Sequence, residues 1–347
     1  MTRRAAPVVI DARAAARREL GGVERVTCEM AARLPRLRPG RYTVMRPPAA
    51  LAQRAGQLWE QALLPVAARR ARAIYCPANA APLVSRRSVV VIHDLAALRH
   101  PEWYSTQFAT YHRRVLPLLA RRARRLITPS EFSRREVAEG LGVDPNDVAV
   151  VPNGVDERFS PSADSEPVRR AYGLERPYVL LVGTRIARKN LGALSTARSR
   201  LDGLGVELVS AGSGRHWTRS DAAQPPARAL GYVPDRHLPG LYAGAAALAM
   251  PSLYEGFGLP VLEAMASGVP VVAADRAALP ETSGGAALLV EPDSGDALAR
   301  ELERVVTDQA LSAKLVKAGL ERASQFSWDR AAVATDAVIA EVVDEWA

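Results

Sequence analysis

Short runs of apolar and β-branched residues alternate along this chain with longer stretches rich in alanine, leucine, glutamate and arginine. Such alternation predicts buried parallel strands with helices on both faces of each sheet. Strands are predicted at residues 8–11, 72–76, 89–92, 126–128 and 148–151, and again at 178–182, 207–211, 227–230, 246–250, 269–273 and 287–290. Two series, each with its own first strand, indicate an α/β chain of two doubly wound, Rossmann-like domains.

The domain boundary follows from turn and proline chemistry. A length of 347 residues suits two domains. Residues 150–154 have turn chemistry, and residues 161–177 are polar and contain proline. The sequence therefore predicts a first domain at residues 1–160, a second at 161–326 and a C-terminal helix at 327–347. Because ligands of open α/β sheets bind at the carboxyl ends of strands, candidate site residues are sought there.

The chain is basic, with a formal net charge of +9. This favours anionic partners: a phosphorylated substrate, an acidic lipid or nucleic acid. The arginines are scattered and lack the interleaved aromatics of a base-stacking platform, which argues against nucleic acid. A basic amphipathic stretch from Phe108, interrupted at Pro117, favours a core-packed helix over one that lies on an anionic membrane.

Cysteine content and hydropathy indicate the compartment. Cys28 and Cys76 form neither a metal-ligand pattern nor a disulfide framework, which fits a reducing cytoplasm. No apolar run approaches the ~20 residues of a membrane span, and the first residues do not resemble a signal peptide. The Asp-x-Asp, His-Glu-x-x-His and Gly-x-Ser-x-Gly patterns are absent, so neither a metal site nor a serine nucleophile is predicted.

The strongest candidate site is the segment 251–268, which follows the predicted strand 246–250. Gly256 and Gly258 allow the backbone to approach a ligand, and the amides of Phe257, Gly258 and Leu259 would open a helix, as an anion site requires. Two carboxylates bracket the loop, Glu255 before it and Glu263 in the expected first helical turn. Each could accept hydrogen bonds from the hydroxyls of a sugar or ribose. The alternative is a plain loop-to-helix junction with Glu263 favouring the helix dipole.

A second candidate site is the turn after the predicted strand 178–182. Gly183 and Thr184 follow this strand, Arg188 and Lys189 add positive charge, and Asn190 could cap the next helix. An arginine and a lysine at a helix start suit a diphosphate. The alternative is a solvated basic turn.

Weaker candidates follow other strands. His93 and Asp94 end the run 89–92, where the histidine could hydrogen-bond a hydroxyl or be satisfied by Asp94 or by backbone. Ser130 is typical of an N-cap, and Gly21 and Gly22 open a helix either as an approach to a ligand or as a plain turn. Three further residues lie downstream of an incomplete glycine motif at 211–214: Gly231, Tyr232 and Val233.

At these residues the chain resembles glycosyltransferase family 4, retaining enzymes of the GT-B fold, almost from end to end. The resemblance rests on Gly21-Gly22, residues 92–95, 129–133 and 151–156, Gly183-Thr184 with Arg188-Lys189-Asn190, residues 231–233, and above all Glu255 and Glu263 with Glu-Gly-Phe-Gly-Leu-Pro at 255–260. Many members carry arginine where this chain has Thr184. The Arg188-Lys189-Asn190 form is similar to a branch with many mannosyl- and rhamnosyltransferases of surface polysaccharides.

The resemblance implies roles for these residues. The second domain would bind a nucleotide-diphosphate sugar and the first an acceptor, with the C-terminal helix crossing back to the first domain. Arg188 and Lys189 would neutralise the leaving diphosphate, Glu255 and the amides of 257–259 would hold the donor sugar and phosphate, and Glu263 the ribose. The base would lie near 231–233, and His93 near the reacting carbon. Gly21, Gly22, Asp94 and Ser130 would lie on the acceptor side.

The resemblance therefore predicts a retaining, metal-independent hexosyltransferase without a permanently bound cofactor. The expected donor is GDP-mannose, with UDP- and TDP-sugars as alternatives, and the acceptor is a glycan, a lipid-linked glycan or a small metabolite. The expected location is the cytoplasm, with peripheral contact to the inner membrane face as an option. Alternatives are a sugar-nucleotide epimerase of the non-hydrolysing type and a non-catalytic GT-B binding protein; a nucleic-acid partner is not expected.

Overall fold

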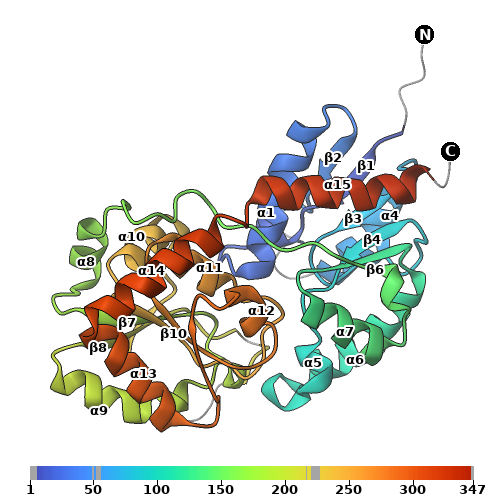
Figure 1. Ribbon diagram of the computed structural model, residues 1–347. Helices are drawn as coiled ribbons and strands as arrows, with labels where there is room; N and C mark the ends of the chain where they lie inside the picture. The colour runs from blue at the N-terminus through green and yellow to red at the C-terminus, as the bar shows by residue number, and fades with distance from the viewer. Residues whose placement is uncertain (1–5, 49–50, 52–55, 216, 220–226, 345–347) are drawn as a thin grey trace. The chain divides into compact units, whose positions relative to one another are not determined.

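A computed structural model describes residues 6–48, 51, 56–215, 217–219 and 227–344. The chain forms two compact units (Figure 1). Unit 1 comprises Met1–Arg99, Ala109–Gly154 and Ser327–Ala347, and unit 2 comprises His100–Phe108 and Val155–Phe326. The sequence placed the boundary at 160/161, whereas the chain leaves unit 1 after Gly154.

Unit 1 is built on a parallel six-stranded sheet in the order β2-β1-β3-β4-β5-β6. Its strands are β1 (Val8–Asp11), β2 (Tyr42–Met45), β3 (Ile74–Cys76), β4 (Ser88–Val91), β5 (Arg125–Thr128) and β6 (Val148–Val150). The four residues of β1 and of β4 are all buried, as the apolar runs predict for strands covered on both faces. Five of these strands are predicted from the sequence and β2 is not.

The helices of unit 1 pack on this sheet: α1 (Gly22–Leu37), α4 (Leu64–Ala67), α5 (Ala96–Arg99), α6 (Thr106–Arg122, of which Ala109–Arg122 belong to this unit), α7 (Glu131–Leu141) and α15 (Trp328–Asp344). The predicted interruption at Pro117 is wrong, because α6 continues through this proline. Leu116 and Leu119 on either side of it are buried in the core, and this packing offsets the lost backbone hydrogen bond.

The C-terminal helix α15 belongs to unit 1 and packs against α1, as Figure 1 shows. Buried Asp336 of α15 receives hydrogen bonds from Tyr42 and from Arg38, whose Nε lies 3.0 Å from Oδ2. The predicted return of the C-terminal helix to the first half of the chain is thus confirmed.

Unit 2 repeats the architecture with a parallel sheet in the order β12-β11-β10-β7-β8-β9. Its strands are β7 (Tyr178–Val182), β8 (Glu207–Ala211), β9 (Arg228–Gly231), β10 (Ala247–Met250), β11 (Val271–Ala274) and β12 (Leu288–Val290). All six are predicted from the sequence, within two residues at each end.

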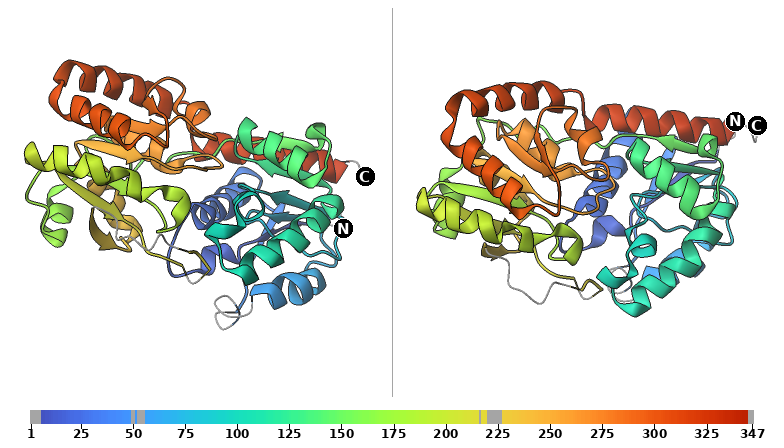
Figure 2. Two further views of the ribbon diagram at one scale, coloured as in Figure 1. Left: turned by 90° about the horizontal axis from the view of Figure 1, so that it is seen from below. Right: turned by 60° about the horizontal axis from the view of Figure 1, so that its bottom comes forward.

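Two groups of helices pack on the sheet of unit 2 (Figure 1; two further views in Figure 2). One group is α9 (Ser195–Gly203) and α13 (Gly295–Thr307), which pack together. The other is α8 (Glu166–Tyr172), α10 (Leu238–Ala243), α11 (Leu259–Ala266) and α14 (Gln309–Ala323), linked by contacts from α8 through α10 and α11 to α14. Short α12 (Leu279–Ser283) packs beside α11.

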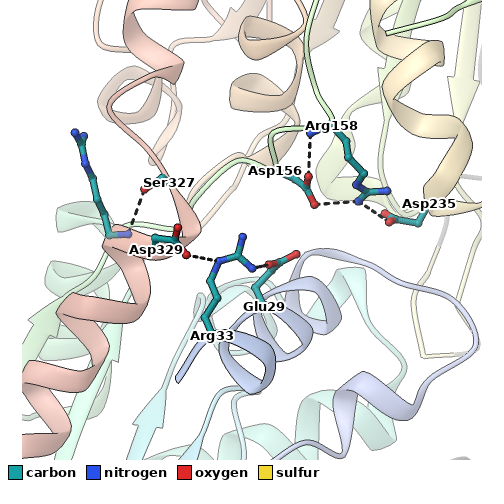
Figure 3. Close-up of polar contacts among 8 residues, drawn as sticks. Glu29, Arg33, Asp156, Arg158, Asp235, Ser327 and Asp329 are labelled. Atoms are coloured by element: carbon teal, nitrogen blue, oxygen red, sulfur yellow. Dashed lines mark hydrogen bonds and ion pairs between the residues drawn. The ribbon is translucent and has the colours of Figure 1, made fainter. Parts of the chain in front are cut away.

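Within each unit, polar contacts hold the segment at which the chain passes from one unit to the other (Figure 3). In unit 2, Arg158 lies 2.8 Å from Asp235 and 3.1 Å from Asp156. In unit 1, Arg33 pairs with Glu29 and lies 2.8 Å from Asp329, while the amide of Arg330 donates to the Ser327 hydroxyl.

The segment His100–Phe108 comes from the first half of the sequence but packs within unit 2. The amide of Ser105 donates to the carbonyl of Trp217 at 2.9 Å, and the amide of Arg219 donates to the carbonyl of Trp103 at 2.8 Å. Backbone hydrogen bonds between residues so far apart in the sequence leave no periodic pattern. The prediction of a continuous first domain therefore did not include them.

Candidate functional site

A pocket in unit 2 lies at the carboxyl ends of β7, β8 and β10, and its lining includes Gly183, Thr184, Lys189, Gly212 and Ser252. In the sheet, β10 lies on one side of β7, and β8 lies on its other side. This is the switch point at which open α/β sheets bind ligands. The predicted position at strand ends is therefore realised for Gly183, Thr184 and Lys189.

Two glycines allow the loops after β7 and β8 to approach each other closely beside this pocket. Gly183 has φ +149°, and a Cβ there would lie 2.6 Å from Cε of Lys189. Gly212 has φ +141°, and a Cβ there would lie 1.9 Å from the carbonyl oxygen of Gly183. No other residue fits either position without displacement, so the loops after β7 and β8 are in direct contact.

Arg188, Lys189 and Glu255 form a buried charge cluster. Nη1 of Arg188 lies 2.8 Å from Oε2 of Glu255, and Nζ of Lys189 lies 2.7 Å from Oε1. Arg188 also donates to the carbonyl of Tyr254 at 2.7 Å. Burial would raise the pKa of Glu255, but the two adjacent cations outweigh it and lower this pKa to about 2. Glu255 is ionised at neutral pH, and the cluster carries one net positive charge.

The loop after Glu255 turns into α11 at Gly258, whose φ is +103°. Pro260 occupies the first turn of α11, as expected, and the amides of Phe257, Gly258 and Leu259 lie at the helix start. The expectation that Glu263 lies in the first turn is wrong. It is the fifth residue of α11, where the helix dipole has little effect. Glu263 is buried and accepts a hydrogen bond of 2.8 Å from the Tyr242 hydroxyl, which the sequence did not suggest.

The remaining predicted residues of unit 2 also lie near this strand edge. The carbonyl of Gly231, at the end of β9, accepts from the amide of Gly212 at 2.7 Å, which brings Tyr232 and Val233 beside the loop after β8. Asn190 does not cap a helix through its side chain, which donates to the carbonyl of Pro292 at 2.9 Å instead. Its φ of +51° suits asparagine, which tolerates the left-handed region.

In unit 1, His93 follows β4 and is 8% exposed. Its Nε2 lies 2.8 Å from the carbonyl oxygen of Pro77. Because a carbonyl only accepts, Nε2 carries the proton and Nδ1 is left as an acceptor. Burial lowers the pKa of His93, which outweighs the bond to Pro77 and the nearby carboxylates of Asp94 and Glu24. The imidazole is therefore neutral, and backbone satisfies one of its nitrogens.

Other predicted residues of unit 1 have local structural partners. Asp94 accepts from the amide of Ala96 at 3.0 Å. Ser130 accepts from the amide of Ser133 at 3.0 Å, which confirms it as the N-cap of α7. Gly21 precedes α1, which begins at Gly22, and the amide of Gly21 donates to Glu24 at 3.0 Å.

A buried polar cluster at the end of β1 was not predicted from the sequence. Trp59 donates to Asp11 at 2.9 Å, and Arg13 pairs with Glu60. Burial raises the pKa of Glu60 to about 7, although Arg13 opposes this. Asp11 ends an apolar strand and could have been noticed, whereas Glu60 lies in a π-helical turn, Trp59–Leu63, that has no clear sequence signal.

Comparison with known proteins assigns the chain to a family. A family model described as Glycosyltransferase Family 4 matches residues 71–159, and one described as Glycosyl transferases group 1 matches residues 176–308. The O-antigen chain mannosyltransferase B of Escherichia coli is 31% identical over 271 residues, which cover 72% of this chain and 69% of that protein. The chain belongs to glycosyltransferase family 4.

A further relative bears on the length of this family 4 chain, and a solved structure bears on its fold. A D-inositol 3-phosphate glycosyltransferase of Salinispora arenicola is 32% identical over 235 residues, 60% of this chain but only 52% of that protein. The solved structure of Anabaena HepE, in complex with UDP and glucose, matches with a TM-score of 0.73 at 20% identity, over 96% of this chain and 99% of that chain. The HepE match confirms the predicted GT-B fold, and the family models with the mannosyltransferase relative confirm the glycosyltransferase class.

The described part of this glycosyltransferase offers neither a metal-binding cluster nor a membrane-spanning helix. No three histidine, cysteine, aspartate or glutamate side chains gather there as they would around a metal ion. Among the same residues, no helix combines the length and hydrophobicity needed to cross a bilayer.

Proposed function

We propose that this family 4 glycosyltransferase transfers a hexosyl group from a nucleotide-diphosphate sugar to an acceptor hydroxyl, with retention at the anomeric carbon. The observation that supports this most directly is the buried cluster of Arg188, Lys189 and Glu255 beside the strand-edge pocket. Two cations held by one carboxylate leave a net positive charge in a largely desolvated place. Such a site stabilises the negative charge that develops on a leaving diphosphate.

The geometry favours a division of roles around this cluster. Arg188 and Lys189 hold the diphosphate, and the amides at the start of α11 add donors to it. Glu255, with a pKa of about 2, has no proton to give at neutral pH, so it orients the cations and accepts from sugar hydroxyls. Glu263, oriented by Tyr242, accepts from the ribose hydroxyls, and residues 231–233 lie along the base.

The proposed donor is GDP-mannose, with UDP- and TDP-sugars as alternatives. The relative named as an O-antigen chain mannosyltransferase supports mannose, whereas HepE was solved with UDP and glucose. The proposed acceptor is a glycan, lipid-linked or not, or a small metabolite, which unit 1 would bind at its strand ends.

The first test is thermal unfolding of the full chain with GDP, UDP, TDP, ADP and CMP at matched magnesium concentration. One nucleoside diphosphate should raise the unfolding midpoint more than the others. At a ligand concentration 100 times Kd, its binding should add about 2.7 kcal/mol to the free energy of unfolding. The Glu263→Ala variant should show a smaller shift with that nucleotide. No shift with any nucleotide would contradict the donor site, and conversion of UDP-N-acetylglucosamine without an acceptor would favour an epimerase.

His93→Ala is expected to lower kcat about 100-fold while changing the KM for the donor little, because its neutral Nδ1 positions a hydroxyl near the reacting carbon. Because burial lowers the pKa of His93, the imidazole is neutral from pH 7 upward, and kcat should not change between pH 7 and 8 through this residue. Steady-state kinetics over that range test both expectations. If the variant keeps its kcat and has a raised KM, His93 does not act at the reacting carbon.

A further inference from the structure

The short helix α12 lies directly against the loop 255–258 of the candidate site. The amide of Ala278, the residue before α12, donates to the carbonyl of Glu255 at 3.2 Å. The hydroxyl of Thr282 donates to the carbonyl of Phe257 at 2.5 Å. Two carbonyls of the loop, two residues apart, are therefore held by one turn of this helix.

The bond from Thr282 to the loop is made in the interior of unit 2. Thr282 is 1% exposed and Phe257 is 7% exposed, so water cannot replace the hydroxyl. The loop also packs closely on α12 at its next residue, because a Cβ on Gly258 would lie 2.9 Å from Cδ2 of Leu279. The position of the loop therefore depends on α12 through both polar and apolar contacts.

The bond to Thr282 fixes the direction of the amide of Gly258. The carbonyl of Phe257 and the N–H of Gly258 belong to one planar trans peptide, in which they point in opposite directions. With the carbonyl on Thr282, this N–H is directed away from α12. Among the described residues, the amides of Gly258 and Leu259 donate no hydrogen bond, although both residues are buried. Donors of this kind at a helix start suit an anion.

Arg322 of α14 holds the carboxyl end of α12. Its Nε donates to the carbonyl of Thr282 at 3.0 Å, and its Nη2 donates to the carbonyl of Glu281 at 2.7 Å. The last carbonyls of a helix have no partner within the helix, so the guanidinium satisfies them. Gly284, at φ +55°, leaves room for this contact, because a Cβ there would lie 2.6 Å from Nε of Arg322.

The same guanidinium supports Phe257 by a second route. Cζ of Arg322 lies 4.7 Å from the centre of the Phe326 ring, and the rings of Phe326 and Phe257 pack edge to face with centroids 5.9 Å apart. The carbonyl of Phe257 is thus held through Thr282, and its side chain is held through Phe326. Arg322 contacts both of these supports.

We propose that Thr282 and Arg322 are positioning residues for the donor diphosphate, and that they fix the peptide after Phe257 so that the amide of Gly258 points at the bound phosphates. The inference rests on the proposed function, because it takes the start of α11 as part of the phosphate site. Neither side chain contacts the ligand, since the hydroxyl of Thr282 is bound to the loop and the guanidinium to α12. Their loss should therefore weaken contacts to phosphate and leave contacts to the base and ribose unchanged.

The test measures equilibrium binding of the full chain to pyrophosphate and to GDP, UDP and TDP, with guanosine, uridine and thymidine as probes that lack phosphate. Thr282→Val has nearly the same shape but no donor. It should weaken binding of pyrophosphate and of the preferred nucleoside diphosphate about tenfold, as expected for one hydrogen bond to a charged group. Binding of the matching nucleoside should not change. Thr282→Ser keeps the hydroxyl and should bind all probes as the wild type does.

The control is Thr335→Val in α15, at a threonine that is 2% exposed and whose hydroxyl lies 3.8 Å from Sδ of Met30. It should lower the unfolding midpoint without changing the affinity for pyrophosphate. If Thr282→Val does not fold, Arg322→Lys decides the question. It keeps the positive charge but not the planar fork that binds two carbonyls, so weaker binding of pyrophosphate would report geometry rather than charge.

The outcomes separate this inference from the proposed function. If the wild type binds neither pyrophosphate nor any of the nucleoside diphosphates, the donor site is wrong, and the role of Thr282 and Arg322 is wrong with it. If the wild type binds them and the variants bind them equally well, only the positioning role is overturned. Equal losses for a nucleoside and its diphosphate would show that α12 supports the fold of unit 2 in general, which also overturns the role.

Discussion

The Glu255→Gln variant is expected to lose about 3–5 kcal/mol of the free energy of unfolding, because it leaves two largely buried cations without their counter-ion. The side chains of Lys189 and Arg188 are only 9% and 18% exposed. Urea unfolding of the variant and of the wild type measures the difference. Glu303→Gln is the matched control, since its pair with Arg200 is about 40% exposed and should contribute no more than about 1 kcal/mol.

The same substitution should make the protein more responsive to anions. Pyrophosphate can take the place of the lost carboxylate, so it should raise the unfolding midpoint of Glu255→Gln by more than that of the wild type. Donor turnover should nevertheless fall, because the cations lose the carboxylate that orients them. Equal responses to pyrophosphate in the two proteins would show that Arg188 and Lys189 do not form the anion site.

The free energy of unfolding at acid pH gives a third test of this cluster. The pKa of Glu255 is lowered from 4.5 to about 2, so its stabilisation is complete above the unfolded value and is lost as pH falls from about 4.5 towards 2. The wild type should lose its advantage over Glu255→Gln across that interval. A constant difference between the two proteins down to pH 2 would contradict the low pKa.

Local patterns predicted most of the fold because both sheets are parallel and buried. Strands such as β7 and β10 are nearly continuous apolar runs, which distinguishes them from the helices around them. Strand β2 gave no such signal. It is an edge strand in which only Tyr42 is buried, and its other residues are half-buried or exposed.

Motif chemistry located the candidate site better than it described the contacts within it. The Glu255 and Arg188-Lys189 segments were correctly expected to belong to one place, because both follow neighbouring strands of one sheet. Their direct pairing was not predicted, and neither was the bond from Tyr242 to Glu263. These contacts join residues 21 to 67 positions apart, and no spacing rule specifies such pairs in advance.

Gly212→Ala is expected to destabilise unit 2 by about 3 kcal/mol or more. A left-handed backbone is strained by about 1–3 kcal/mol for a residue with a Cβ. Here the new Cβ would also overlap the carbonyl of Gly183 at 1.9 Å, and a backbone atom cannot turn aside as a flexible side chain can. Urea unfolding measures the loss, and the thermal response to the preferred nucleotide should disappear because the loops after β7 and β8 would separate.

Gly203→Ala provides the matched control for this prediction. Gly203 is the last residue of α9 in the same unit, and a Cβ there would have nothing within 4 Å. Alanine should therefore be neutral or stabilise the protein by up to about 1 kcal/mol. If both variants unfold alike, the contact between the loops at Gly183 and Gly212 is not what holds the pocket together. If only Gly212→Ala unfolds early, the shape of the pocket at the ends of β7 and β8 depends on a position where no side chain fits.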